Sequence, residues 1–234
     1  MMPGRAPFKA QRQMWSGRPL VNALLAIGLI AMHFSSPAAA DRSVRIVAFG
    51  DSLTAGYQLA PQEAFPAQLE TALRARGHKV EIVNAGVSGD TTAAGLERLA
   101  WAVPDGADAA IVELGANDAL RGLDPAAARR NLHTIVARLK AMRLDVLLAG
   151  MTAPRNWGDA YVRSFDAIFP DLARQEGLLL YPFFLEGVAL QPSLNLSDGL
   201  HPNARGVAVI VERILPAVEQ LIARVAARRK GGTG

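Results

Sequence analysis

The sequence predicts an α/β fold, a doubly wound sandwich around a parallel sheet. Segments with the length of strands alternate with segments of helical periodicity along residues 41–230. The strand segments are apolar throughout rather than at every second position, which is typical of parallel sheets covered on both faces. No internal repeat or low-complexity linker interrupts this order. We therefore expect a single α/β domain over residues 41–230.

Each expected strand is a short apolar run bounded by glycine or by polar residues. The five runs cover residues 44–49, 80–84, 109–114, 146–149 and 178–181. The first and the third are followed directly by a glycine, Gly50 and Gly115. Five strands joined by helices predict one parallel sheet with helices on both faces.

The expected helices are marked by capping residues and apolar stripes. They cover residues 64–76, a segment from Thr91 or Thr92 to about residue 101, a segment opened by Asp124 and Pro125, residues 161–175, and residues 204 to about 228. Proline lacks an N–H group, so we expect a bend near Pro170 and a kink or split at Pro216. Residues 231–234 are expected to form a disordered tail.

The first forty residues are expected to be a cleaved secretory signal. Four basic residues and no acidic residue precede or flank a short apolar run over 20–32, and residues 38–40 form an A-x-A-type cleavage site. An uncleaved membrane anchor is the alternative, but the run is shorter than the ~20 residues that a spanning helix needs. The chain has no cysteine, which excludes lipid anchoring at that residue. We expect a periplasmic or secreted protein without stable membrane insertion after cleavage.

The net charge of +4 comes from this leader. The chain has 25 Lys and Arg against 21 Asp and Glu, and the leader holds four of the basic residues and none of the acidic ones. Residues 41–234 are therefore neutral overall, which gives no reason to expect a nucleic-acid partner. Their number suits one domain with a sizeable core. We expect this part to be a monomer.

Residues that could perform chemistry follow the first three predicted strands. Ser52 lies after the first strand, Gly86 after the second and Asn117 after the third. The carboxyl ends of the strands of such a sheet lie on one rim, where ligands bind. The fold alone therefore brings these residues together, although each is also an ordinary turn residue. The segment around Ser52 is not a G-x-S-x-G elbow, because Thr54 replaces the second glycine.

A serine nucleophile needs a base, and residues 41–234 contain three histidines. His78 lies in a polar turn, and His133 lies outside the apolar stripe of its helix. His201 follows Asp198 by three positions with a glycine between them, so a tight turn can bring the carboxylate to Nδ1 and leave Nε2 for the serine proton. A capping turn, with Asp198 bonded to backbone amides, explains this spacing equally well.

Acyl transfer also needs donors for an oxyanion. The candidates are the N–H groups of Ser52 and Gly86 and the side-chain amide of Asn117. A metal site is the other chemistry to consider, with Asp51 beside the Asp–His pair. The chain has no HExxH motif, no cysteine and no histidine pair at ligand spacing. We therefore expect neither a metal nor a cofactor.

These motifs together resemble those of the SGNH or GDSL hydrolases. Residues 49–57 resemble block I of that superfamily, 84–91 block II, 115–118 block III and 198–203 block V, and the similarity extends over residues 44–220. The letters S, G, N and H fall on Ser52, Gly86, Asn117 and His201. Residues 112–115, 119–122 and 181–184 are most similar to the periplasmic multifunctional thioesterase I, lysophospholipase and arylesterase family. One departure is Leu200, where many relatives have Ile.

The resemblance implies a flavodoxin-like three-layer α/β/α sandwich with a five-stranded parallel sheet and no metal. It also implies a serine hydrolase that cleaves carboxylic esters and thioesters, such as aryl esters, acyl-CoA and lysophospholipids, through an acyl-enzyme. Ser52, Asp198 and His201 would be catalytic. A carbohydrate O-deacetylase on the same fold and a non-catalytic binding protein are the alternatives.

The loop after the fourth strand is the expected substrate site. Its residues 152–158 contain proline and glycine and lie on the predicted active rim. Pro154, Trp157 and Tyr161 could contact an acyl chain there, or they could pack as part of an ordinary loop.

Overall fold

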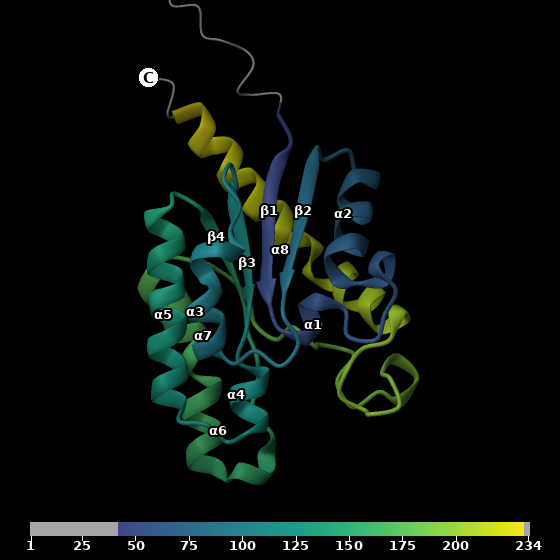
Figure 1. The fold of residues 1–234 in the computed structure, drawn as a ribbon, viewed down its shortest axis with the longest axis vertical. Helices are drawn as coiled ribbons and strands as arrows, with labels where there is room; N and C mark the ends of the chain where they lie inside the picture. The colour runs from purple at the N-terminus through teal and green to yellow at the C-terminus, as the bar shows by residue number, and fades with distance from the viewer. Residues whose placement is uncertain (1–41, 232–234) are drawn as a thin grey trace, which may run out of the picture. The chain divides into compact units, whose positions relative to one another are not determined.

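The computed structural model describes residues 42–231, and they form the predicted α/β/α sandwich (Figure 1). The expected leader and residues 232–234 of the expected tail lie outside the described residues. One sheet contains five parallel strands in the order β2-β1-β3-β4-β5. The strands are β1 (Val44–Gly50), β2 (Val80–Gly86), β3 (Ala109–Glu113), β4 (Asp145–Ala149) and β5 (Leu179–Tyr181).

Helices cover both faces of this sheet, because the connections between parallel strands cross over it. On one face α2 (Phe65–Ala75) packs against α8 (Ala204–Gly231), and on the other α3 (Thr92–Ala102) and α7 (Ile168–Glu176) flank α5 (Pro125–Ala141). The strands between them are buried; Phe49, Ile111 and Leu148, for example, have no exposed surface. This explains why the strand sequences are apolar at every position.

The two expected helix interruptions, at Pro170 and at Pro216, have different outcomes. The predicted helix 161–175 is two helices, α6 (Asp159–Asp166) and α7, which meet at Ala167. The break comes before Pro170, because this proline has no N–H to donate to the carbonyl of residue 166. By contrast, α8 continues past Pro216 to Gly231, so the expected split is wrong and the helix includes the first residue of the expected tail. Pro216 and Glu212 are both exposed, so water can satisfy the freed carbonyl.

Several short helical segments were not predicted. They are α1 (Ser52–Ala55), α4 (Ala116–Leu120) and the 3-10 helices Pro61–Glu63, Arg155–Trp157 and Pro192–Leu194. The two α-helical ones begin shortly after β1 and after β3 respectively. β2 is also longer than predicted, because Ala85 and Gly86 pair with Phe49 and Gly50 of β1. These features place α1 and α4 at the carboxyl edge of the sheet (Figure 1).

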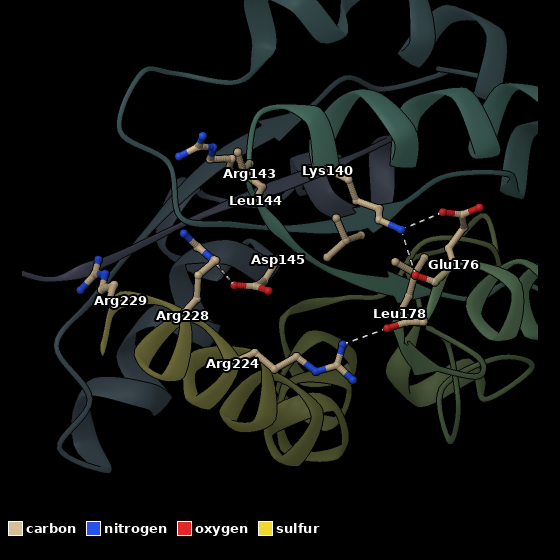
Figure 2. A pocket seen from close by; sticks show the side chains of 11 residues that line it. Lys140, Arg143, Leu144, Asp145, Glu176, Leu178, Arg224, Arg228 and Arg229 are labelled. Atoms are coloured by element: carbon tan, nitrogen blue, oxygen red, sulfur yellow. Dashed lines mark hydrogen bonds and ion pairs between the residues drawn. The ribbon is translucent and has the colours of Figure 1, made fainter. Parts of the chain in front are cut away.

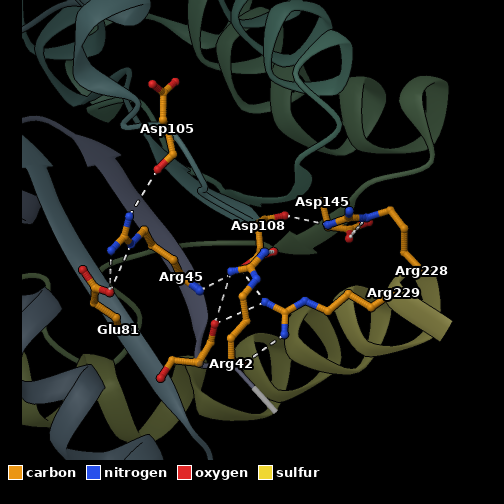
Figure 3. A network of polar contacts seen from close by, with 9 residues as sticks. Arg42, Arg45, Glu81, Asp105, Asp108, Asp145, Arg228 and Arg229 are labelled. Carbon is orange, nitrogen blue, oxygen red and sulfur yellow. Dashed lines mark hydrogen bonds and ion pairs between the residues drawn. The ribbon is translucent and has the colours of Figure 1, made fainter. Parts of the chain in front are cut away.

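The opposite edge of the sheet is held by ion pairs around Asp108, which directly precedes β3 (Figure 3). This carboxylate is 3% exposed and accepts from the backbone N–H of Arg45 at 2.9 Å and from the guanidinium groups of Arg42 and Arg229. Burial alone would raise the pKa of Asp108, but these three donors together lower it below the ordinary value. Asp108 therefore favours the folded state as a carboxylate.

A hollow between α5, β4 and α8 lies at this same edge (Figure 2). Three of its basic side chains pair within the protein: Arg228 with Asp145 at 2.9 Å, Lys140 with Glu176 at 2.8 Å, and Arg224 with the carbonyl of residue 177. The hollow is thus lined by stabilising ion pairs, at the far end of the strands from Ser52. No helix within residues 42–231 has the length and apolar character that a bilayer-spanning helix requires.

Candidate active site

Ser52 is held at the first position of α1, directly after β1 and its cap residue. Asp51 caps this helix, and its Oδ1 accepts the N–H of Leu53 at 3.0 Å. Gly56 ends the helix in the left-handed conformation, with φ of 83°. A helix of only four residues has little stability of its own, so it depends on these caps and on packing. Ser52 is 8% exposed, and its position is fixed by the chain on both sides.

Ser52, His201 and Asp198 form a continuous line of hydrogen bonds. His201 Nε2 lies 3.0 Å from Ser52 Oγ, and His201 Nδ1 lies 2.7 Å from Asp198 Oδ2. Asp198 Oδ1 also accepts the backbone N–H groups of Leu200 and His201, at 2.9 and 3.0 Å. The two interpretations of the spacing are therefore both realised, because one oxygen caps the turn while the other bonds to the ring.

The same contacts keep Asp198 ionised. The backbone N–H groups of His201 and Leu200, followed by the ring, lower the pKa of Asp198 to about 2. A carboxylate at Nδ1 keeps the ring proton on that nitrogen and leaves the Nε2 lone pair facing Ser52. The arrangement can thus remove a proton from the serine hydroxyl.

The ring of Tyr57 covers His201, with ring centroids 4.4 Å apart and the planes tilted by 38°. The position of Tyr57 in the sequence motif gives no sign of this contact. The other two histidines lie elsewhere: His78 Nε2 is 3.2 Å from Glu219, and His133 Nε2 is 3.4 Å from Glu176. Among the described histidines, His201 alone contacts Ser52.

Asn117 and the N–H of Ser52 lie at the same site. Asn117, in α4, donates its amide to the carbonyl of Asp90 at 2.9 Å and to Asp51 Oδ2 at 3.2 Å. The backbone N–H of Ser52 has no acceptor among the described residues. Asn117 is thus linked to the cap of the Ser52 helix, and the Ser52 N–H is free to bind an anionic oxygen.

The structure does not support Gly86 as a third donor. Its N–H donates to Asn84 Oδ1 at 3.0 Å, within its own strand end. A Cβ at this position would lie 2.3 Å from the backbone nitrogen of Ala55 and 2.9 Å from the carbonyl of Asp51. Gly86 is therefore needed for the close packing of β2 against α1.

Gly89, three residues further on, has the free N–H that Gly86 lacks. It has a φ of 88°, and its N–H finds no acceptor within residues 42–231. Its neighbour Asp90 accepts the amide of Asn117, which brings this peptide to the site. Arg121 donates to the carbonyl of Gly89 at 3.0 Å and holds it. Gly86 and Gly89 both lie in the motif of residues 84–91. Only the backbone geometry shows which of the two N–H groups is free.

A buried glutamate beneath Ser52 was also missed. Glu113 is the last residue of β3, has no exposed surface, and accepts a hydrogen bond from Thr54 Oγ1 at 2.8 Å. Nearby, Arg98 is buried against the ring of Phe49 and donates to the carbonyl of Gly50 at 2.9 Å. The sequence does show a single acidic residue in an apolar strand. Acidic residues are seldom buried without a partner, so this residue could have been recognised as part of a site.

Two of the residues expected to contact substrate, Trp157 and Tyr161, pack against α4 and the turn that follows it. Tyr161 Oη donates to the carbonyl of Leu123 at 2.9 Å, and the Trp157 ring lies within 2.9 Å of where a Cβ of Gly122 would be. Pro154 precedes the 3-10 helix that carries Trp157. Trp157 is nevertheless 43% exposed. Among the described residues, no group of three acidic or histidine side chains could hold a metal ion.

A hydroxyl, an imidazole and a carboxylate joined in this order at the carboxyl edge of a parallel sheet define an α/β serine hydrolase. The chain matches the model of the GDSL-like Lipase/Acylhydrolase family over residues 48–209. It therefore belongs to this family, and it is an enzyme that hydrolyses esters.

Curated relatives agree with this assignment. The thioesterase 1/protease 1/lysophospholipase L1 of Escherichia coli K12 is 37% identical over 195 residues, which cover 83% of this chain and 90% of that protein. An arylesterase of Vibrio mimicus is 36% identical over 184 residues, which cover 78% of this chain and 92% of that protein. The crystal structure of AlinE4, described as an SGNH-hydrolase family esterase, is 52% identical, with a TM-score of 0.65 over 76% of this chain and 96% of that one. These relatives favour an esterase over the alternatives of a carbohydrate deacetylase and a binding protein.

Proposed function

We propose that this enzyme cleaves carboxylic esters and thioesters through an acyl-enzyme formed on Ser52. The observation that carries the proposal is the line of hydrogen bonds from Ser52 Oγ through His201 to Asp198, at 3.0 and 2.7 Å. Distances in this range allow a proton to move from the hydroxyl to the imidazole as the hydroxyl attacks.

In the proposed reaction, Ser52 Oγ forms a bond to the acyl carbon while its proton passes to His201 Nε2. The carbonyl electron pair moves onto oxygen, and its return expels the leaving alcohol or thiol, which takes the proton from His201. Water then attacks the acyl-enzyme with the same base and releases the carboxylic acid. Asp198 remains a carboxylate throughout and stabilises the imidazolium, as its pKa of about 2 supports.

The proposed oxyanion donors are the N–H groups of Ser52 and Gly89 and the amide of Asn117. Both backbone N–H groups lack acceptors among the described residues, which supports their role. The amide hydrogens of Asn117 bond to Asp51 and Asp90, so the oxyanion would have to share one of them. Sharing an Asn117 hydrogen is favourable only when the substrate's carbonyl oxygen becomes negative. Asn117 therefore stabilises the transition state more than the bound substrate.

Exposed apolar side chains support an acyl substrate. Val87, Leu120 and Leu200 are 44%, 46% and 52% exposed, and each lies within three positions of Gly89, Asn117 or His201. Pro154, Trp157 and Tyr161 would border the acyl chain further out. The names of the relatives extend the proposed substrates to aryl esters, acyl thioesters and lysophospholipids. Esters and thioesters of graded chain length would test this range.

The proposal includes a periplasmic or secreted monomer with a small-molecule substrate and no nucleic-acid partner. The basic, then apolar, leader that ends in residues 38–40 supports export. Fractionation of cells that produce the full chain, with mass measurement of the mature protein, tests the cleavage. Light scattering of that protein tests the monomer.

The decisive variant is Ser52→Ala. We expect kcat on an aryl acetate to fall by at least about 10³-fold, because no other residue takes the place of the nucleophile. The fold should be unchanged, since the hydroxyl is a small part of the packing. An organophosphonate should label the wild type on Ser52 and leave the variant unlabelled. Substantial turnover by a clean preparation of the variant would refute the proposal.

A further inference from the structure

Three side chains that no solvent reaches form a layer beneath Ser52. Asp51, Thr54 and Glu113 each have no exposed surface. Thr54 Oγ1 donates to Glu113 Oε2 at 2.8 Å, and the backbone N–H of Asp51 lies 3.4 Å from the same oxygen. Glu113 ends β3, whereas the other two lie on either side of Ser52 in its turn. The layer therefore fastens the nucleophile's turn to the central strand.

Space for this layer exists because position 50 has no side chain. A Cβ on Gly50 would lie 2.1 Å from Thr54 Oγ1 and 2.6 Å from Glu113 Oε2. Such distances are far inside van der Waals contact. The glycine that opens the nucleophile's motif is thus matched to a carboxyl group from another strand.

The two buried carboxyl groups differ in their donors. Asp51 accepts hydrogen bonds from the N–H of Leu53 and from the amide of Asn117, both of which favour a carboxylate. Glu113 Oε1 is buried, and no hydrogen-bond donor among the described residues reaches it. A charged oxygen left in this state would be costly, so the negative charge belongs on Asp51 and the proton on Glu113.

The electrostatics agree with this distribution. Burial, and then the negative charge of Asp51, raise the pKa of Glu113 well above its ordinary value. Burial raises the pKa of Asp51 to about 6. The donors from Leu53 and Asn117, the charge of His201 and a hydrogen bond with the Glu113 side chain oppose the rise. The other charged group at the layer is Arg98, which bonds to Asp90 and to the carbonyl of Gly50. Glu113 is therefore neutral where Asp51 is ionised.

We propose that Glu113 is a positioning residue for ester hydrolysis: as a neutral acid it holds Asp51 in place, and Asp51 in turn holds Asn117 and the Ser52 turn. The inference rests on the proposed roles of Ser52 and Asn117. Asp51 is the shared element, because one of its oxygens caps α1 and the other accepts the Asn117 amide. A neutral partner also keeps Asp51 from competing too strongly for the hydrogen that the oxyanion must share.

Glu113→Met tests this role, because methionine has a similar volume and no polar atom for Asp51. Asp51 would then be a buried carboxylate with fewer partners, and it would take up a proton or move toward His201. Both Asn117 and Ser52 act mainly in the transition state, so we expect a fall in kcat of about 10- to 100-fold, less than the roughly 10²–10³ that removal of an oxyanion donor costs. KM should change by less than about 3-fold.

Glu113→Gln is the conservative variant, because its amide remains neutral and can donate to Asp51. We expect Glu113→Gln to recover most of the kcat that Glu113→Met loses.

The matched control is Asp108→Asn, at the other end of the same strand. This variant should lower stability and leave kcat per folded molecule unchanged. Equal losses in the Gln and Met variants, or wild-type kcat in a folded Met variant, would overturn the proposal. Ser52→Ala, assayed in parallel, shows separately whether the nucleophile is assigned correctly.

An infrared measurement keeps the test independent of folding in the Met variant. The wild type at about pH 7 should show the carbonyl stretch of a protonated carboxylic acid that the Glu113→Gln protein lacks. Absence of that band from the wild type would refute the neutral acid, whatever the kinetics of the variants.

Discussion

At the scale of single residues, one carboxylate does two tasks at this site. Asp198 uses Oδ1 to bind two backbone N–H groups and Oδ2 to bind the imidazole. The first task fixes the turn that carries His201, and the second fixes the ring within that turn. Because the tasks use different oxygens, they can be separated by a substitution that changes only one of them.

Asp198→Asn is that substitution. The amide oxygen can still cap the turn, but its NH₂ group would face Nδ1 and favour the wrong tautomer. We expect kcat on an aryl ester to fall by about 10³- to 10⁴-fold with little change in stability. The control is Asp124→Asn, because Asp124 at the start of α5 likewise accepts the N–H two residues on, that of Ala126, at 2.9 Å, and should leave kcat unchanged. A variant at position 198 with more than about a tenth of wild-type kcat would contradict the assigned role.

At the scale of elements, the long segments could be predicted from the sequence and the short ones could not. The apolar strands and the stripe on α5 have patterns that extend over many residues, and the structure confirms them. α1 and α4 have only four and five residues, too few for periodicity to show, and they exist because of caps and packing from elsewhere. The helix breaks at Ala167 but continues past Pro216, although Pro170 and Pro216 are both exposed, so the residue type alone does not predict the outcome.

The site shows the same limit. The sequence predicted the line from Ser52 to His201 because Ser52 lies in one motif and Asp198 and His201 lie together in another. It could not separate Gly86 from Gly89, since both lie in the same motif and only the hydrogen bond from Gly86 to Asn84 distinguishes them. Glu113 was missed because its partners, Asp51 and Thr54, are 62 and 59 residues away in the chain.

Gly86→Ala should damage α1 as an element. The new Cβ would meet the backbone of Ala55 and of Asp51, and backbone atoms cannot move without the helix that carries Ser52. We expect a loss of about 1–3 kcal/mol in the free energy of unfolding, together with a fall in kcat of at least about 10-fold. Denaturant titration and ester assays on the same preparation measure the two effects.

The control for that variant is Gly177→Ala. Gly177 has a φ of 67°, and a Cβ added there would meet no atom within 4 Å, so alanine costs stability through backbone strain alone. It should lose about 1–2 kcal/mol and keep wild-type kcat. If the two variants affected kcat equally, the loss at position 86 would reflect stability rather than the placement of α1.

At the scale of the whole molecule, two sets of carboxyl groups make the stability depend on pH in opposite directions. Asp108 at one edge and Asp198 at the other have lowered pKa values, so their stabilisation is present above about pH 4 and is lost as the pH falls through the folded values. Asp51 and Glu113 have raised pKa values, so their contribution is complete at acid pH and is lost as the pH rises through the folded values. The buried pair thus makes the enzyme less stable toward alkaline pH.

Glu113→Gln should remove part of this alkaline loss. In the unfolded wild type Glu113 is ionised at about pH 8, whereas the folded protein must either keep its proton or bury a second charge beside Asp51. Glutamine has no such cost, so we expect the variant to gain at least about 1 kcal/mol relative to the wild type between about pH 5 and pH 8, or about 2–4 °C in Tm. Thermal unfolding of both proteins at closely spaced pH values measures this difference in stability. The contributions of all other titrating groups cancel in it.

Asp108→Asn should instead flatten the acid side of the stability curve below about pH 4 and leave the alkaline slope as it is. Parallel curves for the wild type and the Gln variant would mean that Glu113 takes up no proton on folding.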